Sequence, residues 1–395
     1  MKRAIYISVL VCIAVVAGSC YRSMDDISVS PNQTTEVHPK SILTYMCFTT
    51  FSIDFYGMQP NRTAWQWDGR SGGGTLNFLR RGWIGEYRRV GYVFEMEKEA
   101  RRVGDERYIH LGAFFRAYWF FNTTRLWGDV PYTEGGHGRE GNMLTPKYDL
   151  QEDIIYGLLA ELKAANDALA EYDGTTIDGD IIYGGSIRQW RKLINMYRLR
   201  ILINCSMKTT VKGENIADMF SDIISDPVKN PIMEKYEDSA ILDESGRQTP
   251  YLFYNDNNFV SAHRVTVNVV ELMKDRGDMR LPKIADVVLR ISNPTEADKQ
   301  DLSKYAGVIP NPGPTNDTNN SGSMDTGDQS RINSKWNLNM TGPNHMAAGY
   351  AEQEFIIAEA ILRGWITGDM KKHYENGISA AYKFLDVPTS DLNAY

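Results

Sequence analysis

The feature that most constrains this chain is residues 114–134, FFRAYWFFNTTRLWGDVPYTE, which are rich in aromatic side chains and sharply punctuated. Over residues 111–121 nearly every position is apolar or aromatic, and the large apolar side chains recur at helical spacing. A helix that is apolar on most of its sides is a buried one. Gly128 and Pro131 end it, because the residue before a proline avoids the helical conformation. The sequence therefore predicts a buried helix with an extended exit.

Two further helices are predicted from their end signals. Asp149 followed by Glu152 can form a capping box that opens a helix, and Gly174 is expected to end it. Ser186 with Gln189 is expected to cap the next helix in the same way. In both segments leucine and isoleucine recur at helical spacing after the cap.

A first helix over residues 40–55 and a last pair over residues 347–365 and 370–385 complete the pattern. Only residues 366–369 join the last two, so these helices must run antiparallel. Residues 108–115 read aromatic-x-x-Leu-Gly-x-x-aromatic, the opening of a tetratricopeptide helix, although the continuation departs from that repeat. We therefore expect a mainly α, tetratricopeptide-like scaffold of helix pairs, an α-α superhelix with long loops.

The first residues resemble a bacterial lipoprotein signal. A basic pair precedes the apolar run 4–17, which is too short to span a bilayer, and two small residues then lead to Cys20. We expect residues 1–19 to be removed as a signal peptide, Cys20 to be acylated, and residues 20–39 to form a flexible tether. The alternative is an ordinary cleaved signal followed by a chance cysteine.

Three segments without helical spacing are expected to be loop insertions in a single helical domain, residues 40–395. They lie near residues 59–75, 244–262 and 309–345, and they are rich in glycine, asparagine, serine or aromatic residues. Loops this long inside a compact domain are usually functional or disordered. We therefore look for ligand-binding residues among them.

The first of these loops contains Trp65, Trp67, Asp68 and Arg70, in a segment whose glycine content argues against helix or strand. An indole ring in a loop needs a partner, and the apolar face of a sugar ring is one. Asp68 and Arg70 would then be hydrogen-bond partners for sugar hydroxyls. Alternatively, one or both tryptophans cap the core beneath the loop.

Composition and motifs exclude several other functions. With 43 basic and 50 acidic residues, the chain has a net charge that disfavours nucleic acid and anionic lipid surfaces as partners. The six histidines show no metal-ligand spacing, and no Walker loop or GxSxG elbow is present, so no metal or cofactor is expected. Cys47 and Cys205 provide no disulfide framework. Glycoside hydrolysis needs only two carboxylates, but the acidic residues here fall mainly at helix surfaces and caps.

Residues 116–134 resemble the signature of the SusD/RagB family, which are lipid-anchored nutrient-binding proteins of the Gram-negative outer membrane. Residues 179–201 and 352–365 are similar to the next two signatures of the family, in the same order. The resemblance implies a SusD-like helical fold with a ligand surface built from loops. It adds Tyr254 and Trp336 to the candidate ligand-binding residues.

The resemblance also implies a role. A SusD-like protein is exposed at the cell surface, anchored in the outer membrane through an acylated cysteine, here Cys20, and delivers a glycan to a TonB-dependent, SusC-like transporter. It is not an enzyme. Family members usually continue with further helices beyond a position equivalent to Leu385, so we expect this chain to be short at its C-terminal end. A peptide- or protein-binding helical scaffold is the alternative function, and a glycoside hydrolase is the least expected one.

Overall fold

The computed structural model describes residues 36–52, 64–66, 84–138, 145–246, 254–255, 263–307, 328–340 and 344–389, with the backbone alone at 64–66, 84, 263, 336 and 337. The chain divides into two compact units, residues 1–38 and Pro39–Tyr395. All the elements below belong to the second unit.

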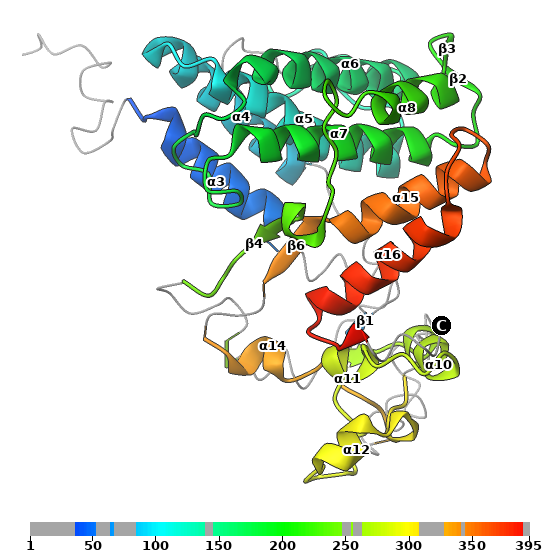
Figure 1. Ribbon diagram of the computed structural model, residues 1–395. Helices are drawn as coiled ribbons and strands as arrows, with labels where there is room; N and C mark the ends of the chain where they lie inside the picture. The colour runs from blue at the N-terminus through cyan, green and yellow to red at the C-terminus, as the bar shows by residue number, and fades with distance from the viewer. Residues whose placement is uncertain are drawn as a thin grey trace, which may run out of the picture. The chain divides into compact units, whose positions relative to one another are not determined.

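Long helices make up most of this unit (Figure 1). They are α3 (Pro39–Phe51), α4 (Ile84–Val103), α5 (Arg107–Trp127), α6 (Gln151–Leu169), α7 (Ile187–Asn204), α8 (Ile216–Ser225), α15 (Tyr350–Leu362) and α16 (Met370–Phe384). Helix α5 packs against α4 and α6, α7 packs against α6, and α15 packs against α16. We call this part the helical body.

Helix α5 is the buried helix that the aromatic stretch predicts. Phe114 lies against rings from α3 and α7, with centroid separations of 6.0 Å to Phe51, 5.7 Å to Trp190 and 5.5 Å to Tyr197. Each such side chain contributes about 1.5–3 kcal/mol when it is fully buried. The helix ends where expected, because Gly128 has a φ of 75° and its N–H donates to Thr124 O at 2.8 Å.

The charge of Arg116, in the middle of this apolar helix, is neutralised by two glutamates. Arg116 forms an ion pair with the buried Glu97 of α4, and its Nε donates to Glu161 Oε2 of α6 at 2.8 Å. Gly112 makes the close approach of Glu97 possible, since a Cβ at that position would lie 2.6 Å from Glu97 Oε1. Three helices are therefore joined by one charged cluster within the core.

The capping box predicted at Asp149 and Glu152 is wrong. Helix α6 begins at Gln151 without a side-chain cap from its N-cap residue. Asp149 Oδ2 instead accepts hydrogen bonds from the backbone N–H groups of Tyr132 and Thr133, at 2.9 and 2.7 Å. The carboxylate that should have capped the helix holds the chain segment after the Gly-Asp-Val-Pro motif.

The cap at the start of α7 is present, with Ser186 Oγ accepting from the N–H of Gln189 at 3.4 Å. Helix α6 ends earlier than predicted and is followed by the 3-10 turn η3 (Ala170–Tyr172), with Gly174 beyond it at a φ of 85°. The last helical pair is antiparallel: a Cβ at Gly368, in the turn, would lie 2.9 Å from Ile361 Cδ1 near the end of α15, whereas Asn376 Nδ2, further along α16, donates to Glu354 Oε2, nearer the start of α15, at 2.9 Å.

Short strands occur at three places. β2 (Thr210–Val211) pairs with β3 (Glu214–Asn215), and β4 (Ala240–Leu242), which follows the 3-10 turn η4 (Tyr236–Asp238), pairs with β6 (His345–Ala348). Because residues 345–348 belong to β6, helix α15 begins later than the sequence predicts. β1 (Ala64–Gln66) pairs antiparallel with β5 (His263–Val265).

Residues 263–307 and 328–340 form a smaller part that we call the lobe. It contains β5, α10 (Val267–Asp275), α11 (Leu281–Ile284), α12 (Glu296–Gln300), η5 (Leu302–Lys304) and α14 (Lys335–Leu338). The lobe has its own apolar core, made by Val265, Val270, Leu281, Ala285, Val287, Tyr305 and Ile332. Within the described ranges, no helix combines the length and apolarity needed to cross a membrane.

Candidate functional site

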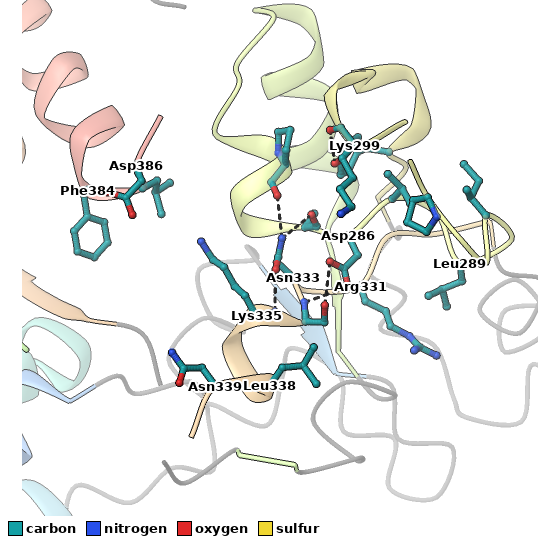
Figure 2. Close-up of a pocket in the computed structure, with 18 of the residues that line it drawn as sticks. Asp286, Leu289, Lys299, Arg331, Asn333, Lys335, Leu338, Asn339, Phe384 and Asp386 are labelled. Carbon is teal, nitrogen blue, oxygen red and sulfur yellow. Dashed lines mark hydrogen bonds between the residues drawn. The ribbon is translucent and has the colours of Figure 1, made fainter. Parts of the chain in front are cut away.

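A cavity of about 1310 Å³ lies between the lobe and the C-terminal end of α16 (Figure 2). Lobe residues form most of its wall, and Tyr236, Asn344 and residues 383–386 complete it. The lobe is held against α16 nearby, where the guanidinium carbon of Arg280 lies 5.0 Å from the centroid of the Tyr382 ring. Met279 packs into the same apolar cluster as Tyr382. The cavity is therefore bounded by two parts that are in contact.

Backbone hydrogen bonds build the lobe side of the cavity. The N–H of Asp286 donates to Arg331 O at 3.0 Å, and the N–H of Asn333 donates to Ile284 O at 2.9 Å. Asn333 also donates from Nδ2 to Pro282 O at 2.9 Å. These bonds fix residues 331–333 beside residues 284–286, so that side chains from both segments line one wall.

Asp286 is the acidic group of this wall. Its carboxylate accepts a hydrogen bond from the N–H of Ser334 at 3.1 Å (Figure 2). Burial raises the pKa of Asp286, although the Ser334 hydrogen bonds and the charge of Arg331 oppose that rise. A half-buried aspartate whose carboxylate already accepts a hydrogen bond from Ser334 can still accept another one from a ligand hydroxyl.

Aromatic and apolar side chains supply the remaining surface. Tyr236 and Phe384 are half-buried in the wall, and Leu338 is 64% exposed. Tyr305 also lines the cavity; it is buried and donates from its hydroxyl to Lys299 O at 2.8 Å. A concave site with aromatic faces and a few placed polar groups suits a small organic ligand such as a sugar.

Most of the residues predicted from sequence lie outside the described part of the chain. These are Cys20, Trp67, Asp68 and Arg70. Tyr254 lies in a turn and is half-buried, but the residues on either side of its two-residue segment are not described. Lipid attachment at Cys20 and ligand contacts at the other positions remain predictions.

The structure places the backbones of the other two candidates, Trp65 and Trp336. Trp336 lies within the lobe, and Trp65 lies in a strand that pairs with the lobe. Trp65 lies in β1 opposite Arg264 of β5, so the prediction that this segment contains no strand is wrong for Ala64–Gln66. Arg264 in turn forms a β-bridge with Arg331, which lines the cavity. Trp336 lies in α14, whose residues Lys335 and Leu338 line the cavity.

The cavity residues themselves were missed by the sequence analysis. One signal was available, since Asp286 interrupts the apolar run Ile284–Val288, and an acid in such a run is usually paired or functional. Lys335 directly precedes Trp336 but carries no motif of its own. In the described part of the chain, no group of three or more His, Cys, Asp or Glu residues is placed to hold a metal ion.

Comparison with known proteins gives a consistent result. The family model SusD-like_2, described as "Starch-binding associating with outer membrane", matches residues 74–395. A solved SusD homologue from Bacteroides fragilis NCTC 9343 is 35% identical, with a TM-score of 0.76, over 91% of this chain and 76% of that one. A Bacteroides vulgatus ATCC 8482 protein, ascribed to the outer membrane and to nutrient binding, is 30% identical, with a TM-score of 0.79 and the same coverages, 91% and 76%.

A more distant structure shares the fold. It is a chitin-binding SusD homologue from Flavobacterium johnsoniae, 20% identical, with a TM-score of 0.69 over 89% of this chain and 72% of that one. No curated protein matches the chain. The structural neighbours confirm the mainly α, tetratricopeptide-like fold that the helix pairs predict.

Proposed function

This chain belongs to the SusD-like family, as the sequence resemblance predicted, and from that premise we propose that it binds an oligosaccharide at the outer membrane and delivers it to a TonB-dependent, SusC-like transporter. The observation that carries the proposal is the combination of the family match with a ligand-sized cavity between the lobe and the end of α16. The family description concerns starch binding at the outer membrane, which supports a glycan as the ligand.

The proposed ligand face extends from the cavity to the predicted loop residues. Trp336 follows Lys335 in α14, and the strand that carries Trp65 is linked through Arg264 to Arg331, so both tryptophans stem from segments next to the cavity wall. The remaining members of the face, by prediction, are Trp67, Asp68, Arg70 and Tyr254. Tryptophan and tyrosine rings stack on sugar faces, while aspartate and arginine bind hydroxyls.

The ligand class follows from the relatives and from the wall. One structural neighbour is described as chitin-binding, and its fold matches this chain. The wall offers aromatic rings, amides and single charges rather than the exposed β-edge or long apolar groove in which peptides bind. A glycan is therefore the proposed ligand, and a peptide is the alternative.

Delivery to a transporter follows from the proposed anchoring at Cys20. A lipid-anchored binding protein cannot carry a polar ligand across a bilayer by itself. It can raise the local concentration of ligand for a neighbouring barrel, because tethering makes the hand-over effectively intramolecular. The helical body offers a broad surface to such a partner, while the lobe carries the ligand face.

A detergent pull-down of the tagged full-length protein from its own host tests the partnership. Mass spectrometry should recover a TonB-dependent barrel, and the variant Trp336→Ala should recover it equally well, because ligand binding and association use different surfaces. An untagged strain is the control. Reproducible absence of a barrel would leave a free-standing surface binder as the better account.

A further inference from the structure

The charge of the cavity is opposite to that of the chain. The chain has 50 acidic and 43 basic residues. The described wall of the cavity reverses this balance, with two acidic residues, Asp286 and Asp386, and four basic ones, Lys299, Arg331, Lys335 and Lys383. A concave surface that concentrates charge of one sign raises the local concentration of ligands of the other sign.

Two of these cations are already paired within the protein. Lys299 Nζ lies 2.6 Å from Glu296 Oε1, and Lys383 forms an ion pair with Glu237. Lys383 also lies over the ring of Tyr236, with its Nζ 4.8 Å from the ring centroid. These contacts reduce the positive charge that either lysine can present to a ligand.

The other two cations are not paired in this way. Across the described residues, neither Arg331 nor Lys335 has a carboxylate within 4.0 Å. Arg331 Nε is buried and donates no hydrogen bond within the described part of the chain. A buried donor that stays unsatisfied costs about 1–3 kcal/mol. Within the described residues, Arg331 therefore carries a charge without a close carboxylate and an Nε–H without a hydrogen bond.

The surroundings of Lys335 disfavour its own charge. Lys335 is exposed at the surface, but desolvation by the surrounding protein lowers its pKa, the neighbouring Lys283 lowers it further, and Asp386 opposes both. Figure 2 shows the Lys335 side chain extending from α14 toward the end of α16, where Phe384 and Asp386 lie. An anionic group brought to this position would stabilise the ammonium that desolvation and Lys283 destabilise.

We propose that the cavity selects an acidic oligosaccharide, whose carboxylate or sulfate groups are bound by Lys335 and, on another part of the wall, by Arg331. The inference rests on the proposed glycan-binding function and narrows its ligand class. Tyr236 and Phe384 would contact the sugar rings, and Asp286 would accept hydrogen bonds from hydroxyls. Asp386 limits the selectivity, because it partly neutralises Lys335.

The test compares glycans that differ only in charge. Isothermal titration of the full-length protein in detergent uses tetragalacturonate and its methyl ester, and maltotetraose and its sulfated form. The charged member of at least one pair should bind about tenfold more tightly, the value of one charge-assisted hydrogen bond. That preference should shrink in high salt, because ions screen the charges of a partly exposed site.

Variants assign the preference to the cavity. Lys335→Met should remove most of the charge preference by weakening the charged member of a pair more than the neutral one, whereas Asp386→Asn should increase the preference. Lys371→Met is the matched control, since Lys371 lies on α16 outside the cavity and is 80% exposed. It should change neither affinity.

Three results would overturn the inference. If neutral glycans bind as tightly as charged ones, the proposed function stands and the acidic ligand class falls. If Lys335→Met weakens both members of a pair equally, the lysine contributes packing rather than charge recognition. If no glycan in either pair and no other glycan in a wider panel binds, the proposed glycan-binding function falls with it.

Discussion

Asp129 Oδ1 accepts a hydrogen bond of 2.8 Å from the backbone N–H of Gln151, the first residue of α6. The aspartate of the Gly-Asp-Val-Pro motif thus satisfies one of the free donors at the start of the next long helix. Replacing such a capping group with alanine costs about 1 kcal/mol. Asp129→Ala should therefore lower the free energy of unfolding by about that amount, measured by urea denaturation.

The control for this change is Glu171→Ala, which removes the same charge from an exposed position in η3. Its effect should stay within about 0.5 kcal/mol, as for most surface substitutions. Equal losses in the two variants would mean that Asp129 acts through net charge and not as a cap.

The charged cluster around Arg116 should be far more sensitive. Removing one partner of a buried ion pair leaves the other uncompensated and costs about 3–5 kcal/mol. Because Glu97 is 6% exposed, Arg116→Met should lower stability by about 3 kcal/mol. Arg125→Met is the control, since Arg125 is exposed and its guanidinium carbon lies 5.9 Å from the centroid of the Phe121 ring. Similar thermal melts for both variants would contradict this account.

A buried aspartate predicts part of the pH dependence. Burial alone would raise the pKa of Asp238, but hydrogen bonds from Lys192 Nζ at 2.8 Å, the N–H of Glu234 at 2.8 Å and Gln189 Nε2 at 2.9 Å lower it overall. A folded pKa below the unfolded value of about 3.9 gives stability that is complete above about pH 4. That stability is lost as the pH falls through the folded pKa.

Asp238→Asn should therefore be less stable than the wild type by about 2 kcal/mol at pH 7, and the gap should close below about pH 4. Denaturation curves at several pH values measure it. Asp275→Asn, at an exposed position at the end of α10, should show no such closing gap. A gap that stays constant down to pH 3 would mean that Asp238 contributes through shape alone.

Lipid anchoring at Cys20 makes a separate prediction. An acyl chain adds roughly 0.8 kcal/mol of membrane affinity per buried methylene, and this affinity vanishes without the cysteine. Cys20→Ala should move the protein from the membrane fraction to the soluble fraction when cells are fractionated. A Cys20→Ala protein that remains in the membrane after a salt wash would show that the lipoprotein interpretation is wrong.

The local parts of the fold were readable from the sequence. The aromatic spacing of residues 111–121 predicted α5 because a buried helix needs apolar residues on most of its faces. The cap at Ser186 was predictable because both of its partners lie within four residues. Signals of this range depend on neighbours in the chain and not on the rest of the fold.

The sequence-based predictions failed where a residue interacts with a segment that is distant in the chain. Asp149 fitted a capping box, but its carboxylate is bound by backbone groups 16 and 17 positions earlier in the chain. Strand β1 was missed because its partner is β5, which lies about 200 positions later. The cavity could not be predicted for the same reason, since Asp286, Lys335 and Asp386 line one cavity only in the folded chain. No local sequence pattern indicates that these three residues are close in space.

The central claim is that the protein binds a glycan without cleaving it, and one titration tests this claim most directly. The full-length protein in detergent is titrated calorimetrically with a glycan panel, and the glycan is recovered and sized by chromatography. We predict saturable heat with at least one glycan, about tenfold weaker binding by Trp336→Ala through lost ring stacking, and glycan of unchanged length. Absence of binding across the panel, or recovery of shortened glycan with new reducing ends, would contradict the account.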